Sequence, residues 1–398
     1  MKNFVFISPN FPVIYWRFCS ELKKNGLRVL GIGDCPYDQL LPELRETLTE
    51  YYKVSNLENY DEVFKGVAFL TYKYGKIDWL ESNNEYWLER DAALRTAFHI
   101  TTGPQESDMA PMKLKSGMKA YYEKAGIPVA RYYVIKDYAE AKAFANKVGY
   151  PVVVKPDNGV GANSTYRLRS DTELDYFFAT KNPSISYIME EMVRGHVCTY
   201  DAIINSKGEP IFESGNVTPN SLMDVVNNNE DSIYYIVKKL PADLLDAGHR
   251  TVAAFGVKSR FVHLEYFRLD EDQAGLGKKG DVIGLEVNMR PAGGYTPDMY
   301  DFSQETDVYK LWADMIAFDK VTLPANRPHH FCAFLGRRDG VSYKMNHDAI
   351  CEKYRVNLKL SGRVPDALSG AMANYMYIAI FDTEEAMMEF YNSLLARN

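Results

Sequence analysis

Three polar residues that alternate along the segment 286–290 could bind a metal ion beside a phosphate. In an extended strand, Glu286, Asn288 and Arg290 share one face, because residues two apart lie on the same side of a strand. Two oxygen ligands suit magnesium, which keeps phosphate oxygens in its shell, and a guanidinium can hold an anionic oxygen with two donors. The alternative is a half-exposed strand that carries a salt bridge between Glu286 and Arg290.

A second carboxylate precedes this segment. Glu265 lies in the segment 263–267, whose pattern is typical of a strand. If the two strands form a hairpin, Glu265 faces Glu286, and two facing carboxylates repel at a cost of up to about 1 kcal/mol. A divalent cation between them removes that cost. We therefore expect Glu265, Glu286 and Asn288 to bind one or two magnesium ions, for which manganese could substitute.

A loop that contains glycine follows a run of valines at 152–154. Lys155 ends that predicted strand, and the loop after it contains Gly159, Gly161 and Ser164. Glycines let backbone N–H groups approach phosphate oxygens, Ser164 adds a hydroxyl donor, and Lys155 adds a positive charge. The order differs from a Walker A loop, because the lysine precedes the glycines. The alternative is a plain turn between two strands.

The segment 187–193 is apolar except for two adjacent acids, Glu190 and Glu191. Its backbone groups, those of Val193 included, could pair with the edge of an adenine base. Met192 could then pack on the face of that base. The alternative is a core strand that ends in two solvated acids.

Taken in this order, these segments resemble the ATP-grasp superfamily, and the resemblance covers about residues 1–320. The family has a lysine on the helix before a Gly-Ile-Pro sequence, a helix that we predict here over residues 112–125. Of its lysines, Lys115 fits best by its spacing to Gly126. The other family motifs match Lys155 before the glycine-containing loop, the hinge Glu190–Gly195, and the metal motif of Glu265, Glu286, Asn288 and Arg290.

One family position departs from the pattern. Val197 stands where the family often has an acid that binds the ribose, while Asp201 matches a later aspartate. His196 could substitute as the ribose contact, or it could be a structural histidine on a strand.

The resemblance implies an ATP- and magnesium-dependent carboxylate–amine ligase, similar to L-amino-acid ligases. It implies that Lys115 and Lys155 hold phosphate oxygens and that Arg290 stabilises an acyl phosphate formed from a small carboxylate. An amine then displaces phosphate to give an amide or dipeptide, with ADP as the other product. Two alternatives stay open: a bicarbonate-activating carboxylase or carbamoyl-phosphate-type enzyme, and a nucleotide-binding sensor without catalysis. Glu85 and the segment 291–296 could border the substrate.

The elements that must position these residues begin with a strand–helix–strand pattern. Residues 4–8 and 27–31 are typical of buried strands, with a helix between them, as in a parallel α/β sheet. The glycine pattern of a dinucleotide-binding loop is absent from the sequence. We expect an α/β and α+β chain, in which a parallel α/β domain precedes a two-lobed ATP-grasp domain. The predicted divisions are the N-terminal domain at 1–110, the small lobe with the phosphate loop at 111–188, the large lobe with the metal site at 189–320, and a small C-terminal subdomain at 321–398.

The composition limits the classes of partner. The 398 residues include 46 Lys and Arg against 53 Asp and Glu, and the net charge of −7 gives no general reason to bind nucleic acid or an anionic membrane. No apolar run approaches the roughly 20 residues of a membrane span. Five scattered cysteines without a CxxC pair fit a reducing compartment, so we expect a cytoplasmic protein with small carboxylate and amine substrates. A heptad repeat is missing, and a homodimer stays open.

Overall fold

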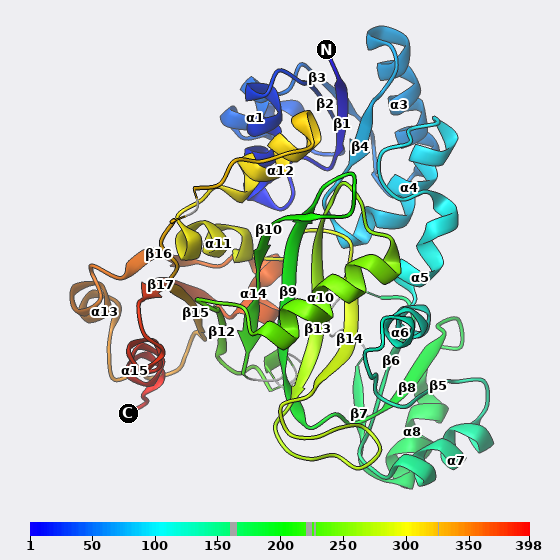
Figure 1. Ribbon diagram of the computed structural model, residues 1–398, viewed down its shortest axis with the longest axis vertical. Helices are drawn as coiled ribbons and strands as arrows, with labels where there is room; N and C mark the ends of the chain where they lie inside the picture. Colours follow the sequence, from blue (N-terminus) through cyan, green and yellow to red (C-terminus); the bar gives the residue numbers. More distant parts are fainter. Residues whose placement is uncertain (160–164, 220–224, 227, 325) are drawn as a thin grey trace.

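The computed structural model describes residues 1–159, 165–219, 225–226, 228–324 and 326–398, and it places them in three β-sheets with surrounding helices (Figure 1). Two predicted phosphate-loop residues, Gly161 and Ser164, lie outside the described residues. In the part of the chain that is described, no helix has the length and apolar character needed to cross a membrane.

A parallel four-stranded sheet forms the N-terminal part, in the order β3-β2-β1-β4. Every residue of β1 is buried, which explains its continuous apolar run, because helices cover a parallel sheet on both faces. This arrangement confirms the predicted α/β start of the chain. The strands are β1 (Asn3–Ile7), β2 (Arg28–Gly33), β3 (Glu50–Lys53) and β4 (Trp79–Glu81), and the helices are α1 (Trp16–Lys24), α2 (Pro42–Thr47), α3 (Tyr60–Tyr74) and α4 (Leu88–Ala97).

The single helix predicted over 112–125 is wrong, because the structure has two helices there. The backbone of Leu114 is extended and separates them (φ −82°, ψ 124°). The second helix begins against the loop after β6: the Lys115 N–H donates to the Asp157 carbonyl, and the Ser116 N–H donates to the Asp157 carboxylate. These long-range bonds fix the break, so the local sequence pattern could not reveal it. The two helices are α5 (Met109–Lys113) and α6 (Lys115–Lys124).

An antiparallel four-stranded sheet with two covering helices forms the small lobe, in the order β5-β8-β6-β7. Its helices begin at side-chain caps, where Asp137 accepts from the Glu140 N–H and Ser170 accepts from the Glu173 N–H. The elements are β5 (Tyr132–Val134), α7 (Tyr138–Val148), β6 (Val152–Pro156), β7 (Tyr166–Leu168), α8 (Asp171–Thr180) and β8 (Tyr187–Glu191).

A nine-stranded sheet forms the remainder, in the order β14-β13-β9-β11-β12-β15-β17-β16, and β10 pairs with β9. The strands after residue 321 extend this same sheet through the pairing of β12 with β15. The strands are β9 (Gly195–Ile204), β10 (Pro210–Ser214), β11 (Asn216–Thr218), β12 (Ser232–Ile236), β13 (Arg260–Leu269), β14 (Val282–Asn288), β15 (Phe331–Arg337), β16 (Leu358–Arg363) and β17 (Tyr375–Phe381).

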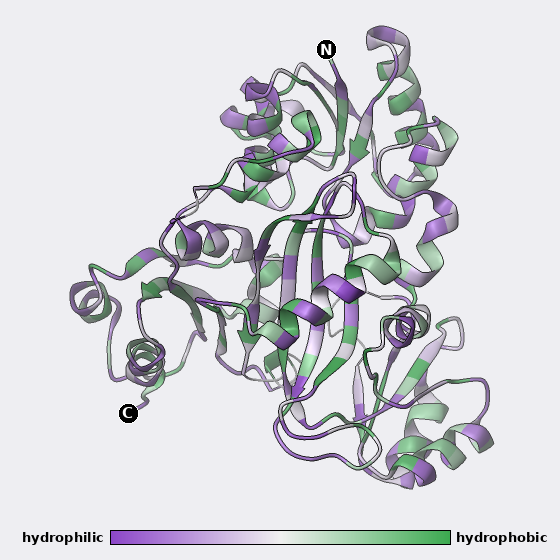
Figure 2. Cartoon of the chain, viewed as in Figure 1, coloured by the Kyte–Doolittle hydropathy of each residue, from purple (hydrophilic) through white to green (hydrophobic). Residues whose placement is uncertain are grey.

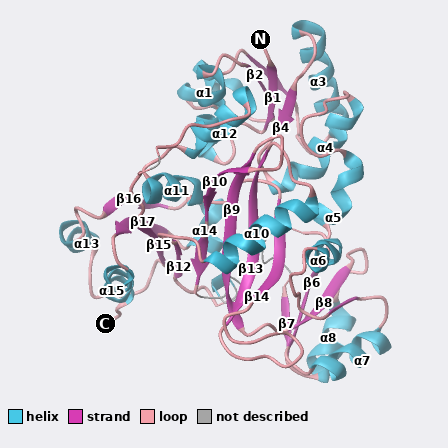
Figure 3. Ribbon diagram, in the orientation of Figure 1, coloured by secondary structure: helices cyan, strands magenta, loops and turns pink. Residues whose placement is uncertain are grey.

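Helices of this last part cover the sheet and also reach the N-terminal part. Figure 1 shows α12 beside α1, and Figure 3 shows how helices and strands are distributed in the same view. The helices carry hydrophobic and hydrophilic stripes in Figure 2, as helices that cover a sheet do. They are α10 (Ala242–Phe255), α11 (Thr296–Gln304), α12 (Val308–Phe318), α13 (His347–Lys353), α14 (Asp366–Met372) and α15 (Glu384–Leu395).

Candidate active site

The two predicted carboxylates lie opposite each other on a hairpin. β13 and β14 are antiparallel neighbours, and Glu265 pairs with Glu286 across them. The hydroxyl group of Tyr122 on α6 donates to the backbone carbonyl groups of both glutamates, at 3.0 Å each. Its ring fills the space that a side chain at Gly284 would need, since a Cβ there would lie 2.5 Å from the ring. α6 therefore fixes the position of the carboxylate pair from behind.

The electrostatic environment distinguishes the two glutamates. Burial raises the pKa of Glu286; Glu265 raises it further, and Lys115, whose Nζ lies 3.3 Å from Oε1, lowers it. Burial would also raise the pKa of Glu265, but His263, Arg290 and Lys115 outweigh that effect and lower it. The two half-buried carboxylates face each other, and the surroundings of Glu286 disfavour its charged form. A divalent cation between the two groups would stabilise both charges.

Asn288 completes a set of oxygen donors beside the two carboxylates. Its Nδ2 lies 3.5 Å from Glu265 Oε1, and its Oδ1 accepts from Arg290 Nη2 at 3.2 Å. Magnesium prefers carboxylate and amide oxygens, and all three donors lie on neighbouring positions of one hairpin. The residues present therefore fit the predicted magnesium site.

A histidine that the sequence reasoning left without a role supports this set. The imidazole of His263 pairs with Asp201 Oδ1 at 2.5 Å and with Glu265 Oε1 at 3.1 Å. Burial lowers its pKa, but the two carboxylates raise it more, to about 9, so the ring is charged at neutral pH. The sequence offered one sign of this role, because His263 lies two residues before Glu265 on the same strand. It offered no sign of the contact with Asp201, which lies on another strand.

Three buried lysines lie close to Glu190 and to the start of the predicted phosphate loop. The Nζ of Lys115 donates to the Gly159 carbonyl at 2.9 Å. Lys155 and Lys119 bind opposite oxygens of Glu190, at 3.0 and 2.9 Å. Burial would raise the pKa of Glu190, but the two lysines lower it to about 2. Lys119 lies one helical turn after Lys115, which was the only sequence signal for it.

The predicted adenine hinge connects the small lobe to the large sheet. The carboxylate of Glu191 accepts from the backbone N–H and the guanidinium of Arg131, both at 2.7 Å, so this side chain connects the hinge to the segment before β5. Val193 is buried in a cluster with Leu269 and Ile283. The side chains of Glu190, Glu191 and Val193 are all buried, and adenine binding by the backbone of this segment stays a prediction.

Gln273 holds the hinge backbone from the loop between β13 and β14. Its Nε2 donates to the Met192 carbonyl at 3.0 Å, and its Oε1 accepts from the Arg194 N–H at 3.0 Å. No role for this loop was predicted from the sequence.

His196, the predicted ribose contact, lies at the start of β9, where its Nδ1 pairs with Asp270 Oδ1 at 2.7 Å.

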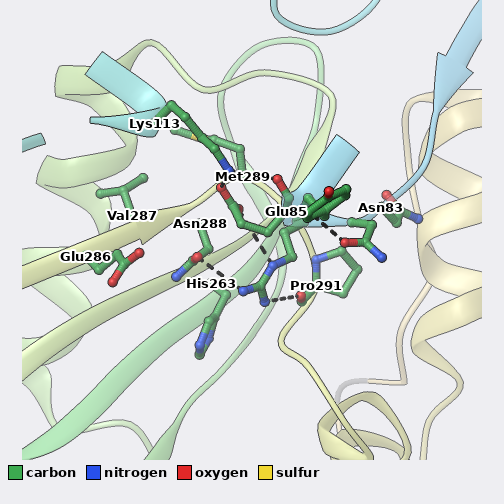
Figure 4. A network of polar contacts seen from close by, with 12 residues as sticks. Asn83, Glu85, Lys113, His263, Glu286, Val287, Asn288, Met289 and Pro291 are labelled. Carbon is green, nitrogen blue, oxygen red and sulfur yellow. Dashed lines mark hydrogen bonds and ion pairs between the residues drawn. The ribbon is translucent and has the colours of Figure 1, made fainter. Parts of the chain in front are cut away.

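Arg290 follows β14 and contacts Glu85 of the N-terminal part; Figure 4 shows its neighbours Asn288 and Pro291 close to Glu85. Its Nη1 donates to the Pro291 carbonyl at 2.8 Å, and its Nε lies 3.7 Å from Glu85 Oε2. Lys113 donates to Glu85 Oε1 at 2.9 Å, while Glu85 Oε2 is buried without a hydrogen-bond partner among the described residues. A polar group of a ligand could bind this free oxygen, beside a guanidinium.

Comparisons with known proteins bear on the sequence and the fold of the chain. No family model matches the sequence. The L-arginine-specific L-amino acid ligase of Bacillus subtilis is 26% identical over 241 residues, which are 58% of this chain and 56% of that protein. The phosphoribosylamine–glycine ligase of Listeria monocytogenes is 29% identical over 127 residues, 30% of each chain. The matches thus span about half or less of these curated relatives.

Solved structures match the whole chain. An L-amino acid ligase from Bacillus licheniformis gives a TM-score of 0.72 at 16% identity, over 100% of this chain and 99% of that chain. The biotin carboxylase domain of the Hydrogenobacter thermophilus 2-oxoglutarate carboxylase, in complex with MgADP and bicarbonate, gives 0.71 at 14% identity, over 99% of this chain and 89% of that chain. The fold of this chain is therefore the fold of these enzymes.

Proposed function

We propose that this chain, which has the ATP-grasp fold predicted from its sequence, is an ADP-forming carboxylate–amine ligase. One observation carries the proposal: two basic side chains lie beside the facing carboxylates of Glu265 and Glu286. Lys115 pairs with Glu286, and Arg290 donates to the neighbouring Asn288. The relatives named as ligases support the same class of reaction. The substrate would be a small carboxylate, with an amino acid as the preferred candidate, and the products an amide or dipeptide, ADP and phosphate.

ATP would bind between the small lobe and the large sheet. Lys115 and Lys155 would hold its phosphate oxygens, and the hinge at Val193 would pair with the adenine edge. Glu265, Glu286 and Asn288 would hold one or two magnesium ions, which neutralise phosphate charge when bound. Phosphoryl transfer depends mainly on positioning and charge stabilisation, and these residues would supply both.

Arg290 would serve the chemical steps. A carboxylate oxygen of the substrate attacks the γ-phosphorus of ATP, the bond to ADP breaks, and an acyl phosphate forms. The amine then attacks the acyl carbon, loses a proton, and phosphate leaves. The Arg290 guanidinium would stabilise the charge that develops on the acyl oxygens, as a fixed donor does in an oxyanion site. The free Oε2 of Glu85 could accept from the ammonium group of an amino-acid substrate.

A second candidate is a bicarbonate-activating enzyme of the same fold. The match to a carboxylase domain in complex with MgADP and bicarbonate favours it, because that structure is as similar overall as the ligase structure. Under either function we propose the divisions 1–110, 111–188, 189–320 and 321–398 and a cytoplasmic location.

The test is phosphate release from ATP and magnesium against amino acids, offered singly and in pairs, with bicarbonate and ammonia as further arms. Release that requires one carboxylate and one amine, with an amide of the expected mass, would establish the ligase. Release that depends on bicarbonate would establish the second candidate. Measurable ATP binding without release in any arm would contradict both and favour a nucleotide-binding sensor.

A further inference from the structure

A cavity of about 550 Å³ lies between the segment 101–112 and the end of α10, and none of the residues that we place in the ATP, metal or Arg290 site lines it. Part of its wall is apolar and aromatic, with the rings of Tyr121 and Phe255 4.7 Å apart. Polar side chains, including those of Ser107 and Lys258, also line it. Its volume, and its position where the N-terminal part meets the large sheet, are typical of sites for small molecules.

A buried guanidinium lines this cavity with one nitrogen unused. The side chain of Arg260 is 3% exposed; its Nε donates to the Met289 carbonyl at 2.7 Å, and its Nη2 pairs with Glu81 at 2.6 Å. Its Nη1 has no hydrogen-bond partner within the described part of the chain. Gly103 also lines the cavity, and a Cβ there would lie 3.4 Å from this nitrogen. Because residue 103 is a glycine, no side chain covers this buried nitrogen from that position.

A second buried guanidinium lies next to Arg260. Arg95 is fully buried, shares Glu81 with Arg260, and has an Nη2 that lacks a hydrogen-bond partner among the described residues. Asp91 accepts from Ser82, and burial together with Glu81 raises its pKa. Because a buried charge without a partner is costly, an anion at Arg260 Nη1 would stabilise this cluster.

We propose that this cavity binds a small organic carboxylate with an apolar body. The carboxylate would accept from Arg260 Nη1, and the apolar body would lie against Tyr121 and Phe255. Lys258 adds a positive charge to the lining, while the carboxylate of Asp108, which also lines the cavity, already accepts from the Gln105 N–H at 2.8 Å. This binding site goes beyond the proposed ligase activity and does not depend on it.

The experiment is calorimetric titration of the full chain with 3-phenylpropionate, compared with its neutral analogue 3-phenylpropionamide. We expect binding of one equivalent of the carboxylate and binding of the amide that is weaker by at least about tenfold, because the amide carbonyl can still accept from the guanidinium but carries no negative charge. Ser107 is exposed on the lining, so Ser107→Trp should fill the cavity without disturbing the core, and should weaken binding by at least about tenfold. The matched control Ser107→Ala should bind as the unaltered chain does.

Arg290→Ala separates this site from the proposed active site, and we expect it to leave 3-phenylpropionate binding unchanged. Binding that is lost in Arg290→Ala, or that survives in Ser107→Trp, would place the carboxylate elsewhere and overturn the proposal. Equal binding of the amide would also overturn it, as would the absence of binding at about 10 mM ligand. Inorganic phosphate that binds where 3-phenylpropionate does not would replace the proposal with a site for an inorganic anion.

Discussion

Two buried lysines, Lys119 and Lys155, form ion pairs with the carboxylate of Glu190, and a substitution of this one residue tests their effect. Its folded pKa of about 2 lies below the ordinary value of 4.5, so the charged form is stabilised by folding. This contribution is complete above pH 4.5 and is lost as the pH falls towards 2. We expect Glu190→Gln to lower the free energy of unfolding by roughly 3 kcal/mol at pH 7, and by less as the pH falls below 4.5.

Urea unfolding of both proteins from pH 7 to pH 3.5 would measure this difference. Glu123→Gln, on the exposed side of α6, is the control and should change stability by less than about 0.5 kcal/mol. A difference for Glu190→Gln that does not shrink below pH 4.5 would show that its charge is not what stabilises the lysines.

Arg290 should affect chemistry more than nucleotide binding. It contacts Asn288 and the Pro291 carbonyl but none of the lysines near the phosphate loop. We expect Arg290→Ala to lower kcat by about 10²- to 10³-fold, as the loss of one oxyanion donor does, with the Kd for ATP within about threefold. Arg290→Lys should recover part of kcat, because it keeps the charge and loses the paired donors. A selective loss of ATP affinity would place Arg290 in the nucleotide site.

Glu286 should be needed for the metal and not for the fold. We expect Glu286→Gln to lower kcat by at least about 100-fold and to weaken Mn²⁺ binding, which electron paramagnetic resonance can measure directly. The circular dichroism spectrum should be unchanged. Glu271→Gln, which alters an exposed ion pair with Arg194, is the control. Full turnover in Glu286→Gln would contradict the metal assignment.

Individual site residues could be predicted where strand geometry alone determines the neighbour. The alternation along β14 and the hairpin with β13 were enough to pair Glu265 with Glu286. Lys119 and His263 could not be assigned in this way. The partner of each lies on another element: Glu190 for Lys119 and Asp201 for His263. No local spacing in the sequence connects these pairs.

At the scale of elements, the loop between β13 and β14 should control nucleotide affinity through Gln273. Its two hydrogen bonds fix the peptide groups on either side of Val193. We expect Gln273→Ala to raise the KM for ATP by about tenfold with kcat within about twofold, because each bond contributes about 1 kcal/mol. Lys279→Ala in the same loop is the control. A fall in kcat at unchanged KM would assign the loop to the chemical step.

The boundaries of elements were harder to predict than their types. The first strands and the strand–helix–strand order follow from apolar runs that a parallel sheet buries. The break at Leu114 depends instead on bonds to Asp157, some 40 residues later, as the sequence numbers show. The helical pattern of the sequence continues through Leu114, so the sequence alone does not indicate the break.

At the scale of the whole molecule, α12 should join the N-terminal part to the rest. Trp312 is 1% exposed, and its ring contacts those of Phe4, Phe6 and Phe18. We expect Trp312→Ala to lower the free energy of unfolding by about 3 to 5 kcal/mol, as the loss of a buried aromatic ring does. Tyr72→Ala, at a side chain that is 92% exposed, should change it by less than about 0.5 kcal/mol. If urea unfolding showed the same loss of stability for Trp312→Ala and Tyr72→Ala, the result would contradict this packing.

Sequence patterns predicted the parts of the fold up to the large sheet, while the residue limits of these parts stay a prediction. The N-terminal α/β part and the two lobes follow from local patterns and from the order of the motifs. The extension of that sheet by β15, β16 and β17 requires a pairing with β12, nearly 100 residues earlier. Such non-local pairing has no signature in a single sequence, because many apolar strands could serve as the partner.

In a carboxylate–amine ligase a substrate carboxylate attacks ATP, and the transfer of its oxygen to phosphate can be measured. The protein would be incubated with ATP, magnesium and amino acids whose carboxylates carry ¹⁸O, and the released phosphate would be analysed by mass spectrometry. A carboxylate–amine ligase must move one labelled oxygen from the carboxylate into each phosphate, since the acyl phosphate breaks at the acyl carbon. Unlabelled phosphate would contradict the account, because it would mean that water or bicarbonate attacks ATP.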